Sequence, residues 1–215
     1  MRRQVPILTG LLALTLSACA GNTGGDADLI TITDPANLTL IEVPSSWHVY
    51  EIEEINELER VPFVENVQGL EFPVESVVGF DASPVDDVEN LSTQVVAADF
   101  PIGAATVRSV GERERDFVSR YALTQSVLPY LTLPNAQELT KEDFSFGNGY
   151  EGVRVLVAFA DATGQNLGVA YMISVTDESD ERIFSVVAGC SRECFIDHQP
   201  DIESVVDSWL VNTRD

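Results

Sequence analysis

The first nineteen residues constrain this chain more than any other part of its sequence. Arg2 and Arg3 form a short basic start, and a mainly apolar stretch follows over residues 5–18. Spanning a bilayer takes about 20 apolar residues, so this stretch is too short for a transmembrane helix. A basic start followed by a short apolar run is typical of a secretory signal peptide. The sequence therefore predicts that residues 1–18 direct export and are then removed.

The signal segment ends in Leu16-Ser17-Ala18-Cys19, which resembles the lipobox of bacterial lipoproteins. In that motif small residues before the cysteine fit the peptidase, and the cysteine thiol becomes a thioether to diacylglycerol. Acylation of the freed α-amine adds a further chain, and two or three chains make a stable anchor where one does not. The alternative is an ordinary secretory peptide cut after an A-x-A-like site. We expect Cys19 to be lipidated and to hold the chain at the extracytoplasmic face of the cell membrane.

Charge limits the partners of the rest of the chain. The sequence has 12 basic and 35 acidic side chains and a formal net charge of −23. Nucleic acid is excluded as a partner, because phosphate binding needs a basic surface. The Gly-rich residues 20–28 are typical of a flexible tether. We therefore expect the lipidated cysteine and tether over residues 19–36 and a single domain over residues 37–215.

Alternation of apolar residues predicts strands in both halves of the domain. In the second half, three alternating or apolar segments are joined by residues of turn composition, which indicates an antiparallel meander over residues 152–160, 167–175 and 183–189. In the first half, strands are predicted over residues 38–43, 47–52, 76–81 and 93–100.

Two helices are predicted to frame the meander. Ser109 and Glu112 have the spacing of a capping box that opens a helix, which Pro129 then stops. A second helix is predicted to begin near Pro200. Its apolar residues follow the helical period at Ile202, Val205, Val206, Trp209 and Leu210. The predicted fold class is α+β, an antiparallel sheet flanked by helices.

Two segments resemble a known family. Val43-Pro44-Ser45-Ser46-Trp47-His48-Val49 is similar to the P-x-x-W-x-V opening strand of PsbP-like domains, and the closing helix ends in Asp207-Ser208-Trp209-Leu210-Val211. Many bacterial members of that family are lipoproteins of actinobacterial envelopes, of the LpqN type. The resemblance implies an α/β/α sandwich that binds other proteins and has no common catalytic residues. The extra cysteine pair is not part of the family's pattern.

Cys190, Cys194 and His198 stand four residues apart. In an exported protein, a pair of cysteines left after lipidation is most simply a disulfide, here closing a tight loop between the third meander strand and the last helix. Two thiolates and an imidazole are also ligands for copper or zinc. A redox-active dithiol is the third interpretation. All three remain open at the level of the sequence, and no other metal site or cofactor is predicted.

The remaining candidates for chemistry are two histidines and three acidic clusters. A Ser/His/Asp triad would have to recruit His48 or His198, and no Gly-x-Ser-x-Gly motif supports one. The acidic clusters lie over residues 51–59, 86–89 and 177–181. They lack the calcium-loop pattern, so a solvated anionic surface is the favoured interpretation over Ca²⁺ binding or a glycosidase carboxylate pair.

These observations predict a membrane-anchored extracytoplasmic lipoprotein without enzymatic activity. The expected partner is an envelope protein or a small ligand, and the membrane itself is contacted through the lipid on Cys19. The alternative is a lipoprotein that handles a metal or electrons at Cys190, Cys194 and His198.

Overall fold

Two antiparallel sheets form the protein, whose computed structural model describes residues 28–55, 73–119, 123, 125, 128, 135–147 and 149–212. The small sheet has the order β1–β2–β10, and the large sheet has the order β3–β4–β5–β9–β8–β7–β6. The strands of the small sheet are β1 (Leu29–Thr33), β2 (Thr39–Pro44) and β10 (Leu210–Val211). Those of the large sheet are β3 (His48–Glu51), β4 (Val74–Asp81), β5 (Ile102–Ser109), β6 (Gln137–Gly147), β7 (Tyr150–Ala160), β8 (Leu167–Thr176) and β9 (Arg182–Ser191).

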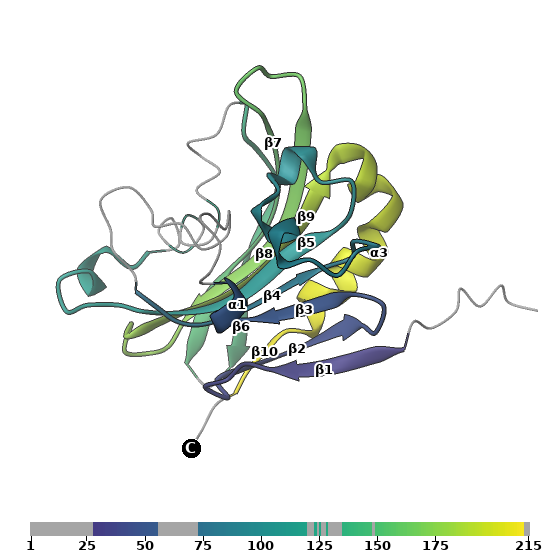
Figure 1. Ribbon diagram of the computed structural model, residues 1–215. Coiled ribbons are helices and arrows are strands. Elements are labelled where there is room, and N and C mark those ends of the chain that lie inside the picture. The colour runs from purple at the N-terminus through teal and green to yellow at the C-terminus, as the bar shows by residue number, and fades with distance from the viewer. Residues whose placement is uncertain are drawn as a thin grey trace, which may run out of the picture.

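One long helix, α3 (Arg192–Ser208), packs against β8, β9 and β2. Figure 1 shows α3 along one side of the large sheet, with the small sheet below it. The other face of the large sheet carries short elements: α1 (Ile52–Ile55), η1 (Val88–Ser92) and η2 (Val95–Ala97). A further turn of 3-10 helix, η3 (Arg115–Phe117), follows β5. Helices therefore cover the two faces unequally in the described part of the chain, so the predicted helix-flanked sandwich is supported only in its coarser form, a sheet-rich α+β fold.

The central strands of the large sheet are buried on both faces. Val153, Val155 and Val157 of β7 are at most 1% exposed, as the predicted alternation requires. In β5, β8 and β9 nearly every residue is buried, so these strands do not alternate between apolar and polar residues. In a sheet that is covered on both faces, both sides of each strand are buried, so its residues need not alternate between apolar and polar.

The strand predictions succeed where the alternation is clear. The meander is confirmed as β7, β8 and β9, paired antiparallel in sequence order. The predicted strands over residues 38–43, 47–52 and 76–81 are confirmed as β2, β3 and β4. The prediction over residues 93–100 is wrong, because Val95–Ala97 forms the 3-10 helix η2, with Val95 and Val96 packed into the core. The strand of this region is β5, which begins two residues later.

Both predicted helix starts are also wrong. Ser109 is the last residue of β5, opposite Arg182, and its N–H donates to the Pro73 carbonyl at 2.9 Å, so it caps no helix. Beyond η3, Leu123 is helical and its N–H donates to the Ser119 carbonyl, whereas the expected end at Pro129 lies outside the described residues.

The last helix begins eight residues before Pro200, which lies inside it. Ser191 is its N-cap, with a side-chain oxygen that accepts from the Cys194 N–H at 3.4 Å. The helix ends at Ser208, and Trp209 is its C-cap. Leu210 therefore belongs to β10 and is 51% exposed, so it is not part of the buried helical stripe.

The start of the domain differs from the prediction as well. The tether was expected to run to residue 36, but β1 pairs with β2 from Leu29 to Thr33. The turn that joins them is organised by Asp34, which is 4% exposed. Its carboxylate accepts hydrogen bonds from the N–H groups of Ala36, Leu38 and Thr39, and from the hydroxyls of Thr39 and Ser76. The bond from Ser76 of β4 ties the small sheet to the large one.

Candidate functional site

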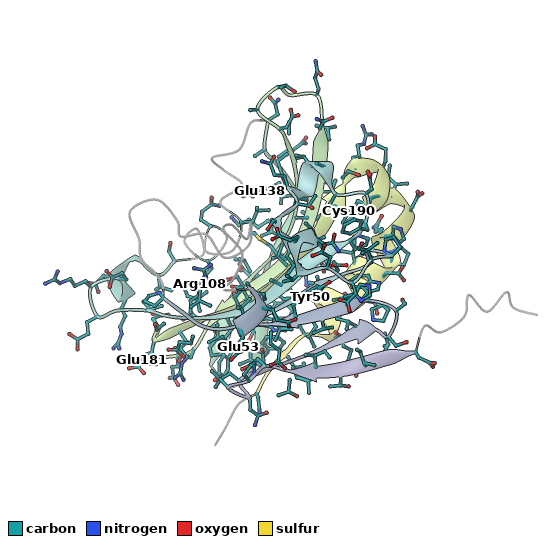
Figure 2. All side chains as sticks on the ribbon, in the orientation of Figure 1. Tyr50, Glu53, Arg108, Glu138, Glu181 and Cys190 are labelled. Carbon is teal, nitrogen blue, oxygen red and sulfur yellow. A yellow bond between two sulfur atoms is a disulfide. The ribbon has the colours of Figure 1, made fainter. Side chains whose placement is uncertain are left out.

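Cys190 and Cys194 lie where β9 passes into α3, and their sulfur atoms are at disulfide distance, 2.09 Å apart. Cys190 is fully buried and Cys194 is 6% exposed; Figure 2 labels Cys190 within the fold. A disulfide removes both thiolates, which are the groups that a metal or redox site would use. The described residues contain no group of three or more side chains placed to hold a metal ion. The pair therefore links the end of β9 to the first turn of α3 and does not close a loop between them.

His198 lies further along α3 and does not complete a site with the cysteines. Its side chain is 43% exposed, and its Nδ1 is 3.6 Å from the Asp201 carboxylate, one turn along the helix. His198 is therefore a partly exposed residue inside α3, beside an acidic one.

His48 belongs to a polar cluster at one end of the large sheet. It is opposite Asp81 in the β3–β4 register, and its Nδ1 is 3.6 Å from an oxygen of Asp86. The neighbouring Tyr50 hydroxyl accepts from the Asp87 N–H at 3.1 Å. Asp81 is 0% exposed and accepts from the Ser83 N–H at 2.8 Å.

Burial sets the protonation behaviour of this cluster. It raises the pKa of Asp81 above its ordinary value, and burial together with the charge of Asp81 raises that of Tyr50. No serine hydroxyl is hydrogen-bonded to His48 in the described part of the chain, so the cluster is not a nucleophilic triad. Its hydrogen bonds instead hold the segment that follows β4 against β3.

The acidic cluster at residues 177–181 lines a cleft at the end of β7, β8 and β9. The larger of two adjoining cavities has a volume of about 440 Å³ and is lined by Gly149, Glu151, Thr176, Asp177, Glu178 and Asp180. The smaller, about 230 Å³, shares Glu151, Thr176 and Asp180 with it. Figure 2 labels Glu181 beside this region, at the lower left.

Within the described part of the chain, most of these carboxylates have no basic partner. Glu181 is paired with Arg115 at 3.0 Å, and Asp177 accepts hydrogen bonds from Ser179 and from the Glu181 N–H. Among the described residues, Glu151, Glu178 and Asp180 form no ion pair. The cleft is therefore a concave, anionic surface suited to a cationic group.

Arg154 forms a second surface cluster, which sequence reasoning missed. Its guanidinium lies over the Phe144 ring at 4.7 Å and 3.1 Å from the Asp207 carboxylate of α3. The Tyr171 hydroxyl donates to the same carboxylate at 3.1 Å, and burial raises the pKa of Tyr171. The signal for this cluster was one arginine in the apolar run of β7 that follows Gly152. The cluster joins four elements, β6, β7, β8 and α3, and its two charges, Arg154 and Asp207, are paired with each other.

A row of polar side chains is buried inside the large sheet. Thr106, Ser185 and Ser174 are opposite one another across β5, β9 and β8, and the two serine hydroxyls are 2.7 Å apart. Arg108, one pleat further along β5, is 0% exposed, and burial lowers its pKa to about 10. No sequence motif marks this row, because small polar residues are common in strands.

Comparison with known proteins gives likenesses of structure. No model of a known protein family matches the chain, and a search of curated proteins finds no match. LpqN of Mycobacterium tuberculosis, involved in cell envelope biogenesis, has a TM-score of 0.50 at 11% identity, over 86% of this chain and 91% of its own.

Two further solved structures resemble the chain. PsbP (CyanoP) of Synechocystis sp. PCC 6803 has a TM-score of 0.46 at 13% identity, over 92% of this chain and 99% of its own. The Ran-binding protein Mog1p of Saccharomyces cerevisiae has a TM-score of 0.46 at 11% identity, over 86% of this chain and 96% of its own.

The likeness to LpqN concerns the fold alone. It supports the resemblance seen in the sequence at that level, a sheet-rich α+β domain of the LpqN type. The lipid on Cys19 stays a prediction. None of the helices in the described part of the chain has the length and apolar run needed to cross a bilayer.

Proposed function

We propose that the chain is a lipid-anchored extracytoplasmic module that binds a partner at the cell envelope and catalyses no reaction. The observation that carries the proposal is the motif Leu16-Ser17-Ala18-Cys19, placed ten residues before the first strand of the folded domain. Two or three acyl chains at Cys19 give stable attachment. LpqN, which has a similar fold, is involved in cell envelope biogenesis, and an envelope location agrees with such an anchor.

The partner we infer carries a cationic segment that enters the acidic cleft. Three observations support this choice: the cleft is concave, Glu151, Glu178 and Asp180 have no ion pair among the described residues, and the net charge of the chain is −23. A potential of one sign in a cleft attracts the opposite charge and speeds association. The metal-handling alternative needs free thiolates at Cys190 and Cys194, and their sulfur atoms are at bonding distance; the redox alternative requires that this disulfide be reduced and re-formed.

The test is a charge reversal in the cleft with a matched control elsewhere. Glu151→Lys with Glu178→Lys alters the cleft, and Asp86→Lys with Glu89→Lys makes the same change in charge at exposed positions outside it. In cells that export the chain, a crosslinker at the cleft should capture a partner, and only the cleft variant should lose it. The proposal fails if both variants capture the partner equally well. It also fails if the purified domain turns over an envelope substrate and a point substitution abolishes that turnover.

A further inference from the structure

The outer face of the small sheet is the side turned away from the large sheet. The β1–β2 and β2–β10 registers place on it Leu29, Thr31, Thr33, Leu40, Glu42 and Leu210. The opposite side carries Ile41, Val43 and Val211, each at most 9% exposed, and they belong to the core. Leu29 and Leu210 are 49% and 51% exposed, so the outer face presents apolar side chains to its surroundings.

This face differs in charge from the rest of the molecule. The three strands of the small sheet hold a single charged side chain, Glu42, in a chain whose net charge is −23. In the described part of the chain six large apolar side chains are exposed; Leu29 and Leu210 lie on this face, and Ile30 lies on the opposite side of the same sheet, paired with Val43. The other three are dispersed over a loop, β6 and α3, at Val85, Leu139 and Ile196.

The position of this face, close to Cys19 in the sequence, favours the membrane as the surface that covers it. Leu29 follows Cys19 by ten residues, so the lipid is attached at most about 35 Å from the start of β1. Figure 1 shows β1 at the lower rim of the molecule. An acidic domain held this close to anionic head groups is repelled by them, except where its surface is uncharged. Exposed leucines enter the interfacial region of a bilayer favourably.

We propose that the outer face of the small sheet lies against the membrane that holds Cys19. This inference rests on the proposed lipid anchor. The occupant is the lipid surface rather than a second copy of the chain, because the anchor on Cys19 keeps a membrane within reach of this face, whereas two chains with a net charge of −23 repel each other.

The test measures which residues touch lipid in the lipidated protein. Thr31→Cys places a nitroxide on the outer face, and Ile196→Cys places one at a 66% exposed apolar position of α3, as a matched control. Both proteins are reconstituted into vesicles of phosphatidylethanolamine and phosphatidylglycerol. Collisions are measured with oxygen, which dissolves in lipid, and with a nickel chelate, which stays in water. We expect the label at position 31 to lose its nickel collisions and keep its oxygen collisions, and the label at position 196 to keep both.

Three results would overturn the inference, and they are distinguishable. If the protein stays on the vesicles but both labels meet nickel equally, the face is not against the membrane, and the anchor stands. If the protein does not remain on the vesicles, anchor and orientation fail together. If the label at position 31 is shielded from nickel in the soluble domain without vesicles, a second copy covers the face. A further variant, Leu29→Glu with Leu210→Glu, should restore the nickel collisions at position 31, whereas Ile196→Glu should not.

Discussion

β1 and β6 are both edge strands, yet they present opposite surfaces to the solvent. β6 carries Glu138, Lys141, Glu142 and Asp143 and is exposed along most of its length. β1, with the sequence LITIT, has no charged residue and is exposed over four of its five positions. Proteins commonly protect free strand edges with charge, because an uncharged edge pairs with other strands. The difference agrees with the proposal that β6 meets water and that β1 lies against the membrane.

The two sheets also differ in how they are held. α3 is tied to the large sheet by a covalent bond between Cys190 and Cys194. The small sheet depends on hydrogen bonds: those of Asp34, those between Ser208 and the Glu42 backbone, and that from the Asn212 N–H to Leu38. The face proposed to meet the membrane is therefore attached by noncovalent contacts that mutation can remove one at a time.

The largest effect is expected at Asp34. Asp34→Ala leaves a group of buried donors without an acceptor, and unsatisfied buried donors cost about 1–3 kcal/mol each, so the free energy of unfolding should fall by at least about 3 kcal/mol. Urea denaturation measures the loss. The matched control is Asp161→Ala, since Asp161 accepts a similar set of bonds at the β7–β8 turn, but in solvent. A loss no larger than that of the control would show that Asp34 does not hold the small sheet.

The disulfide comes next. Replacing Cys190 and Cys194 together by alanine should lower the free energy of unfolding by about 2 kcal/mol, on loop-entropy grounds. Denaturation of the oxidised protein and of the double variant gives the difference. Crosslinking to the partner should be unchanged, because the acidic cleft is lined by other residues. Loss of partner capture in a folded double variant would favour the redox or metal alternative.

A smaller effect is expected from Asp81, as a change in pH dependence. Burial raises the pKa of Asp81, so the folded protein favours its protonated form. The stability that this group contributes is complete below its unfolded pKa and is lost as the pH rises through the folded one. Asp81→Asn cannot ionise, so its stability relative to the wild type should rise as the pH rises from about 4, near the unfolded pKa of Asp, to about 7. Parallel stability profiles over that range would contradict the assignment.

The smallest effect on stability is expected on β6. Glu138→Thr, Glu142→Thr and Asp143→Thr should change the free energy of unfolding by less than about 0.5 kcal/mol each, since the residues lie at the surface and the ion pair of Glu138 with Lys141 is a surface pair. They should nevertheless promote self-association, which sedimentation measures, because the edge loses its charges. Replacing Glu151, Glu178 and Asp180 by threonine removes the same charge from the cleft and should leave the protein monomeric. Equal association of both variants would mean that the net charge, rather than the charges on the β6 edge, prevents self-association of the protein.

The sequence predicts the strands whose apolar residues either alternate or form a run bounded by residues of turn composition. β2, β3, β4 and the three meander strands were located in this way. β5 was missed because its residues are small and buried on both faces, so no period is visible. The start of α3 was missed because Pro200 looked like a first turn, whereas Ser191 supplies the cap eight residues earlier.

β1 and the clusters around Asp34 and Arg154 were missed because they depend on contacts between segments that are far apart in the sequence. The segment LITIT followed by Asp34-Pro35-Ala36-Asn37 has the composition of a hairpin, but its proximity to the Gly-rich residues 20–28 made a tether the natural interpretation. The buried role of Asp34 depends on Ser76 of β4, which is 42 positions away. The contacts of Arg154 with Phe144 and Asp207 likewise join segments that are far apart in the sequence. Such clusters form only when the fold brings distant segments together, so the sequence around each residue does not reveal them.

The most direct test of the account is the intact mass of the chain isolated from the membranes of an exporting bacterium. We predict a protein that begins at Cys19, lacks residues 1–18 and carries added mass from diacylglycerol and acyl chains on that residue. The Cys19→Ser variant should lack this mass and should leave the membrane fraction. A mature chain that begins after a different residue, or that carries no lipid at Cys19, would contradict the anchor and the membrane orientation derived from it.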